Sequence, residues 1–166
     1  MDAIVVSAVQ GVAAGAGAPL AAAADIVLAG ASARFTLAYT KIGLSPDGGS
    51  SLLTASLGLH RALHLALLNP MLSAEQARVA GLVAEVYPDD ELDAAVDAVV
   101  DQLLAGSRTA QVAAKRLLRE VALPWAEGAL RRETLSIRSC AAGPDGREGV
   151  DAFVAKRAAA FPSTRQ

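Results

Sequence analysis

The chain has 166 residues, of which 53% are hydrophobic and only 4% aromatic, so its core must be aliphatic. This length suits one domain, or one domain with an appendage. The formal net charge is −2 without a long basic block, which argues against a nucleic-acid partner. No apolar run is long enough and free enough of glycine, proline and charge to predict a membrane span. The single cysteine, Cys140, cannot form an internal disulfide, and it fits a reducing, cytoplasmic setting.

The first half of the chain alternates short apolar strands with turns and short helices. Residues 4–9 are apolar and largely β-branched, which predicts a buried strand before a glycine turn and a short helix over 17–24. The elements expected next are strands at 26–29 and within 32–37, a turn at 45–49 with a helix to about 57, helices at 59–68 and 74–81, and a strand at 82–86. The strand–turn–helix units 4–24 and 26–57 resemble each other loosely.

The second half is helical in pattern. Apolar residues recur at spacings of three and four from Leu92 to Leu104, and helices are also expected over 109–122, 126–141 and 145–159. We therefore predict an α/β region at 1–88 and an all-helical region at 89–166, with a boundary near Pro88.

The stretch GVAAGAGAPLAAAA at 11–24 places three glycines between two apolar strands. A strand, a glycine turn and a helix start can present backbone N–H groups to an anion or to a developing oxyanion. The same glycines can also serve only to let a helix pack closely on a strand. The pattern alone leaves both interpretations open.

The spacing of Gly11, Gly15 and Gly17 also matches the NAD(P)-binding turn of short-chain dehydrogenases. The following helix is too short for that fold, because Asp25 begins the next strand. No acidic residue stands at a strand end about 20 positions on to hold the ribose. The Tyr-x-x-x-Lys pair of those enzymes is missing too, so NAD(P) binding is kept as a remote alternative.

Asp47 lies in the turn Ser45-Pro46-Asp47-Gly48-Gly49 at an expected helix start. From spacing alone, a turn or capping aspartate is the commoner interpretation. The functional alternative is a carboxylate that faces a pocket and acts as a general base. His60 and His64 lie four residues apart, but no third ligand is evident, so no metal site is predicted.

Four segments together resemble the crotonase (enoyl-CoA hydratase/isomerase) superfamily. They are VVSAVQGVAAGAGAPLAAAADIVLA, SARFTLAYTKIGLSPDGGSSLL, LSAEQARVAGLVAEVYPDDEL and REGVDAFVAKRAAAF, in the family's order along the whole chain. The resemblance implies an α/β fold, the ClpP/crotonase-like ββα spiral, of which this chain carries the C-terminal turns. An all-helical trimerisation region follows the spiral.

The resemblance also assigns candidate catalytic residues. In the family, the turn before the short helix donates a backbone N–H to the thioester oxygen, and by position this donor is Ala16, between Gly15 and Gly17. Hydratases use two glutamates, where this chain has Pro19 and Tyr39. Asp47 instead resembles the acid/base aspartate of enoyl-CoA isomerases, and also the nucleophile of a dehalogenase branch. The stretch AYTKIGLSPDGG is closest to the isomerase branch, so the resemblance favours a double-bond shift with Asp47 as the base.

The same resemblance implies a substrate and an assembly. The substrate is an acyl-CoA thioester, so no separate cofactor and no metal are expected, and the chain is expected to form a homotrimer or a dimer of trimers. Besides the glycines beside Ala16, the substrate-binding residues expected are Ala38, Tyr39, Leu44, Phe153 and Lys156.

Family members carry a further N-terminal part, which supplies the other oxyanion N–H. The resemblance implies that this part of the fold is missing here. A catalytically dead assembly module, which keeps only the trimer surface, is therefore an alternative to an active enzyme.

Overall fold

A computed structural model describes residues 2–165, with side chains up to residue 163, so Met1 and Gln166 lie outside the described residues. The strands are β1 (Val6–Val9), β2 (Val12–Ala14), β3 (Ile26–Gly30), β4 (Arg34–Thr36), β5 (Leu72–Ser73) and β6 (Glu85–Tyr87). The α-helices are α1 (Gly17–Ala22), α2 (Thr54–Leu57), α3 (Leu59–Leu68), α4 (Ala74–Val79), α5 (Leu92–Ala105), α6 (Arg108–Ala122), α7 (Ala126–Ala142) and α8 (Pro144–Val154). Three 3₁₀ helices, η1 (Thr40–Ile42), η2 (Ser50–Leu53) and η3 (Pro162–Arg165), complete the described elements.

The strands form two three-stranded sheets, in the orders β1-β3-β6 and β2-β4-β5. The first sheet is parallel, with Val6 opposite Ile26. In the second, β2 runs parallel to β4 with Val12 opposite Arg34, and β5 is antiparallel to β4. The two chain segments predicted to resemble each other therefore pair side by side, β1 with β3 and β2 with β4. This pairing brings the glycine turn next to the end of β4.

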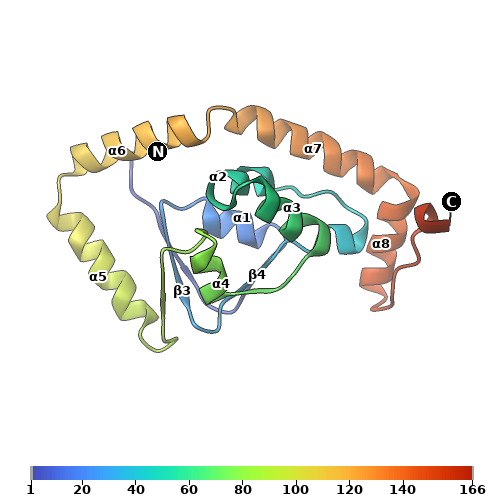
Figure 1. Cartoon of the computed structure of the whole chain (residues 1–166), viewed down its shortest axis with the longest axis horizontal. Helices are drawn as coiled ribbons and strands as arrows, with labels where there is room; N and C mark the ends of the chain where they lie inside the picture. Colours follow the sequence, from blue (N-terminus) through green and yellow to red (C-terminus); the bar gives the residue numbers. More distant parts are fainter. Residues whose placement is uncertain (1, 166) are drawn as a thin grey trace.

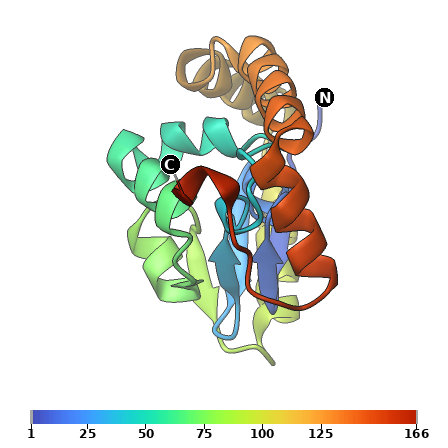
Figure 2. The ribbon, with the colours of Figure 1, turned by 90° about the vertical axis from the view of Figure 1, so that its right-hand side faces the viewer.

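The helices from α5 onward run as an arch around this α/β core (Figure 1). Helix α5 packs on β1 and β3, α7 on η2, and α8 on η1 and α7. The view turned by 90° shows α8 beside the strands, below the end of α7 (Figure 2). Among the described helices, none combines the length and the apolar character that a membrane crossing requires. The division into domains at Pro88 stays a prediction.

Most of the expected elements are confirmed, and the exceptions have local causes. The strands β2 and β5 were not predicted, because they are three and two residues long and depend on pairing with β4. The last helix ends at Val154 and not at 159. Lys156 takes a left-handed φ of 52°, and the N–H of Arg157 donates to Ala152 O at 3.0 Å, which closes the helix end. The predicted strand 82–86 is reduced to β6.

The core is aliphatic, as the composition predicts. Its most buried large side chains are Phe35, Leu28 and Leu65. Many alanines fill the space between elements, among them Ala18 and Ala77, each 0% exposed. Small side chains let the short helices approach the sheets closely, which places the turns at their ends within contact of one another.

A partly buried ion-pair cluster connects α6 to the start of the sheet. The Asp25 carboxylate, 11% exposed, accepts from Lys115 Nζ at 2.7 Å and from Arg119 Nε at 2.8 Å. It also accepts from the N–H of Val5 at 2.8 Å. Burial by itself raises the pKa of Asp25. The hydrogen bonds from Lys115, Val5 N–H and Arg119 outweigh burial and hold this pKa below the usual 3.8.

Asp25→Asn is therefore expected to lower the free energy of unfolding at neutral pH by about 1–3 kcal/mol, because two cations lose their counter-charge. A carboxyl whose folded pKa is lowered stabilises the fold above its unfolded pKa, and this contribution disappears as pH falls through the folded pKa. The difference in free energy of unfolding between wild type and variant should thus shrink below pH 3.8, the usual pKa of an aspartate. Urea unfolding across pH measures this gap. Asp97→Asn, at an exposed site on α5, is the control and should show no such gap.

The contact between α8 and η1 depends on a glycine. A Cβ built on Gly149 would overlap the carbonyl oxygen of Ile42, a backbone atom that cannot move aside alone. Gly149→Ala is therefore expected to destabilise the chain by about 1–3 kcal/mol through overpacking. Thermal unfolding is the measurement. In Gly128→Ala on α7, the new methyl meets only Arg132 Nη1 at 3.6 Å, so helix propensity predicts a gain of about 0.5–1 kcal/mol. Equal stability of the two variants contradicts the packing argument.

Candidate active site

The turn between β2 and α1 presents a free backbone donor. Gly15 has φ +56° and its N–H donates to Thr36 O at 3.1 Å, which ties the turn to the end of β4. Ala16 follows with φ −63°, is exposed, and directly precedes α1. None of the hydrogen bonds found within the described residues uses the Ala16 N–H. The turn therefore leaves this N–H available to a ligand.

The turn that carries Asp47 packs against Ala16. Gly48 and Gly49 have φ of +67° and +92°, a left-handed pair that favours glycine. A Cβ built on Gly48 lies 3.2 Å from the Cβ of Ala16 and 3.7 Å from Tyr39 Oη. The two segments that the sequence predicted as catalytic are thus in contact, although they are about 30 residues apart.

The main chain of Asp47 is fixed by three donors. Its carbonyl oxygen accepts from Tyr39 Oη at 3.2 Å, from Ser50 Oγ at 2.6 Å and from Ser50 N at 3.2 Å. Asp47 as a residue is partly buried, and its carboxylate accepts none of the hydrogen bonds found among the described residues. Asp47 is therefore not a helix-capping side chain here. Its backbone is held while its carboxylate stays free to react.

Tyr39 supports this turn from the core. It is 9% exposed, and burial raises the pKa of its phenol, to which the charge of Asp47 adds. The phenol is therefore neutral at physiological pH and donates its proton to the carbonyl of Asp47. Pro19, the other residue at a hydratase glutamate position, lies in α1, with its Cβ 3.9 Å from a Cβ built on Gly49.

Glu133 is the site residue that the sequence analysis missed. This α7 side chain is 6% exposed, and its carboxylate accepts from the N–H groups of Gly49 at 2.7 Å and Ser51 at 2.6 Å. Its place in a run of charged and polar residues resembles an exposed helix face, and no sequence pattern reveals that it turns inward.

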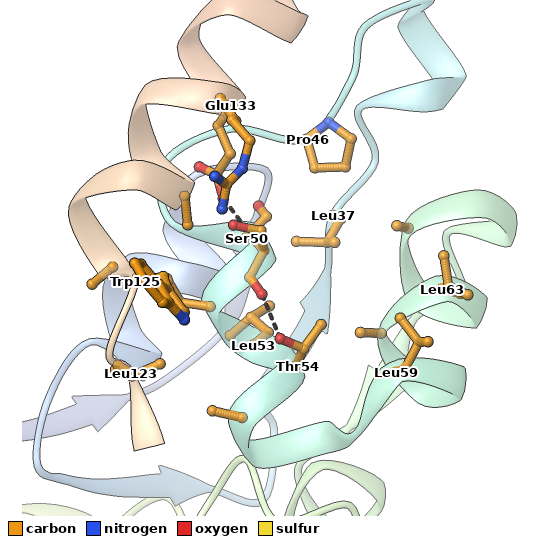
Figure 3. Close-up of a pocket in the computed structure, with 18 of the residues that line it drawn as sticks. Leu37, Pro46, Ser50, Leu53, Thr54, Leu59, Leu63, Leu123, Trp125 and Glu133 are labelled. Carbon is orange, nitrogen blue, oxygen red and sulfur yellow. Dashed lines mark hydrogen bonds between the residues drawn. The ribbon is translucent and has the colours of Figure 1, made fainter. Parts of the chain in front are cut away.

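A cavity of about 660 Å³ opens beside the Asp47 turn, between α2, α3 and the start of α7 (Figure 3). Apolar side chains dominate its wall, including Leu37, Leu59, Leu63 and Trp125. Pro46 and Ser50 line it, whereas Asp47 and Ala16 do not. The cavity is therefore bordered by the residue that precedes Asp47 in the chain.

The other predicted substrate-binding residues are only partly brought together. Ala38 lies two residues beyond the end of β4 and has a left-handed φ of 59°, a strained backbone next to Tyr39. Leu44 is partly buried and packs on the core. Phe153 is 70% exposed and Lys156 is exposed beyond the end of α8, and neither lines the cavity.

The site offers no ligand set for a metal ion. His60 and His64 are both exposed on α3. Within the part of the chain that the structure describes, no three His, Cys, Asp or Glu side chains gather in a way that could hold a metal. Two carboxylates lie at the Asp47 turn: Glu133 is hydrogen-bonded to its amides, and Asp47 accepts none of the hydrogen bonds found among the described residues.

Comparison with known proteins identifies the class of protein. The model of the enoyl-CoA hydratase/isomerase family matches residues 1–164. The chain is 40% identical over 158 residues to the 1,2-epoxyphenylacetyl-CoA isomerase of Escherichia coli, covering 95% of this chain and 60% of that one. It is 39% identical over 154 residues to a probable enoyl-CoA hydratase of Rhodobacter capsulatus, covering 92% and 60%.

A solved structure agrees with these relatives. The crystal structure of an enoyl-CoA hydratase from Mycobacterium avium subsp. paratuberculosis superimposes with a TM-score of 0.92 at 43% identity, covering 96% of this chain and 65% of that one. The chain therefore belongs to the enoyl-CoA hydratase/isomerase family and has the crotonase fold. It spans about 60% of the length of the curated relatives it matches.

Proposed function

We propose that this chain carries an enoyl-CoA isomerase site. In this proposal, Asp47 moves a proton while the Ala16 N–H stabilises the thioester enolate. The observation that supports it best is the contact between the Asp47 turn and Ala16, with the carboxylate of one and the N–H of the other both free. Relatives carry both isomerase and hydratase names, so the choice between the two activities rests on the residues.

Isomerisation needs one base that serves two carbons. Asp47 removes a proton from C2 of a 3-enoyl thioester, which is acidified by the thioester carbonyl. The negative charge then lies on the thioester oxygen, where a backbone N–H stabilises it in the transition state. The protonated Asp47 returns the proton at C4, and the double bond moves to C2–C3 with no net gain or loss of atoms.

Hydration is disfavoured because a second carboxylate is missing. Addition of water needs a positioned water molecule and, in the family, two glutamates. Pro19 has no ionisable group and Tyr39 is neutral at physiological pH, since burial raises the pKa of its phenol. The proposal thus assigns the whole proton transfer to Asp47.

We assign the acyl chain of the substrate to the apolar cavity beside Pro46. Its volume of about 660 Å³ lies in the usual range for small-molecule sites.

The proposed assembly, a homotrimer or a dimer of trimers, is supported by exposed apolar side chains along α6 and its junction with α7. These side chains are Leu117, Leu118, Val121 and Trp125.

Product analysis tests the isomerase proposal. The chain is incubated separately with a trans-3-enoyl-CoA and with a trans-2-enoyl-CoA, and the thioesters are separated chromatographically. Conversion of the first to the conjugated 2-enoyl thioester supports the proposal. Formation of a 3-hydroxyacyl thioester from the second favours a hydratase. No turnover of either thioester, together with no binding of either, favours the catalytically dead assembly module.

A further inference from the structure

Glu133 is a buried carboxylate that the proposed reaction does not use. It extends from α7 toward the segment that carries Ser50, as Figure 3 shows. Its Oε2 accepts from Gly49 N and its Oε1 from Ser51 N, both within 2.7 Å. Both donors follow Asp47 in the same turn. One carboxylate from the helical region therefore bridges two backbone amides of the candidate active site.

Both carboxylate oxygens of Glu133 are engaged with backbone amides. Each of its oxygens already accepts a short N–H bond, and such charge-assisted bonds are stronger than neutral ones. The donors lie at the start of η2, where backbone N–H groups lack partners within the helix. Glu133 therefore satisfies these amides in place of a local capping residue.

It matters for Asp47 that Glu133, and not a local side chain, accepts from the Gly49 N–H. Aspartate commonly accepts a hydrogen bond from the N–H two residues further along its own chain. For Asp47, that donor is Gly49 N, which Glu133 already occupies. Without Glu133, the Gly49 N–H becomes an open donor for the Asp47 carboxylate within its own turn.

We propose that Glu133 is a positioning residue: by occupying the amides of Gly49 and Ser51, it holds the turn against Ala16 and keeps the Asp47 carboxylate free for substrate. This role rests on the proposed isomerase function. It links α7, late in the chain, to the reacting group more than 80 residues earlier.

The structural part of the proposal is tested without turnover. Amide hydrogen exchange by NMR is measured for wild type, Glu133→Gln and Glu133→Asp. We expect slow exchange at Gly49 and Ser51 in wild type and at least tenfold faster exchange at Ser51 in Glu133→Gln, with Glu133→Asp in between. Glu127→Gln changes an exposed carboxylate on the same helix and should leave both amides unchanged. Unaltered protection in Glu133→Gln overturns the proposal.

The functional part is tested by separating kcat from KM. Misplacement of a reacting group by about 1 Å can cost about a hundredfold in rate. Glu133→Gln should therefore lower kcat for 3-enoyl-CoA by roughly tenfold to a hundredfold per folded molecule, with KM little changed and partial recovery in Glu133→Asp. A rate loss that only follows the folded fraction overturns the positioning role. If wild type itself shows no turnover, the isomerase proposal fails, and the exchange rates alone decide whether Glu133 holds the turn.

Discussion

Asp47→Asn should abolish the double-bond shift while the chain stays folded and keeps its affinity for an acyl-CoA thioester. General acid–base catalysis contributes about 10²–10⁴ in rate, and here one residue performs both proton transfers, so we expect a loss of about a thousandfold or more in kcat. Binding should persist because the variant removes a charge but little volume. The turn should persist because the bonds from Tyr39 and Ser50 reach the main-chain carbonyl of Asp47 and not its side chain.

Two measurements check this expectation. The isomerisation rate is followed with a 3-enoyl-CoA, and the affinity is measured by calorimetric titration with an unreactive thioester. Asp101→Asn, at an exposed site on α5, carries the same loss of charge far from the turn and should retain wild-type kcat. Retention of the wild-type rate by Asp47→Asn would refute the role of Asp47 as the base.

The sequence predicts those parts of the fold that depend on local patterns. The apolar β-branched run of β1, the capping box of Ser73 and Gln76, and the spaced apolar residues of α5 each indicate one element, and each is observed. Elements that form only through pairing escape this reasoning. Strand β2 lies in an alanine-rich stretch and becomes a strand because β4 lies parallel to it.

In the candidate site, too, some features have a local sequence pattern and others depend on partners far along the chain. The glycine turn and the Pro-Asp turn can be recognised in the sequence, but the pattern alone leaves their roles open, and the resemblance to the family is what selects Ala16 and Asp47 as candidate residues. Glu133 has no such pattern, since its role depends on a partner more than 80 residues away. The structure also corrects the interpretation of Asp47 from spacing alone. A capping aspartate binds backbone amides, and in this chain Glu133 binds them instead.

Ala16→Pro should slow isomerisation by about a hundredfold to a thousandfold, the usual consequence of losing one donor to a developing oxyanion. Proline has no N–H, and its ring fixes φ near −65°, which matches the −63° that Ala16 already adopts. Gly15, the residue before it, has no Cβ, so only its backbone N–H can crowd the proline ring. The variant thus removes the donor at a φ angle that proline accepts, and the Ala16 N–H holds no bond among the described residues whose loss could unfold the turn.

Ala16→Gly keeps the N–H at the same place, so it should retain most of the rate. If both variants fold, as thermal unfolding can establish, and Ala16→Pro reacts as fast as Ala16→Gly, then the thioester oxygen does not bind this N–H. The opposite result means that the charge of the enolate is carried by the backbone of the glycine turn, which explains why glycines stand on both sides of Ala16 in an otherwise alanine-rich stretch.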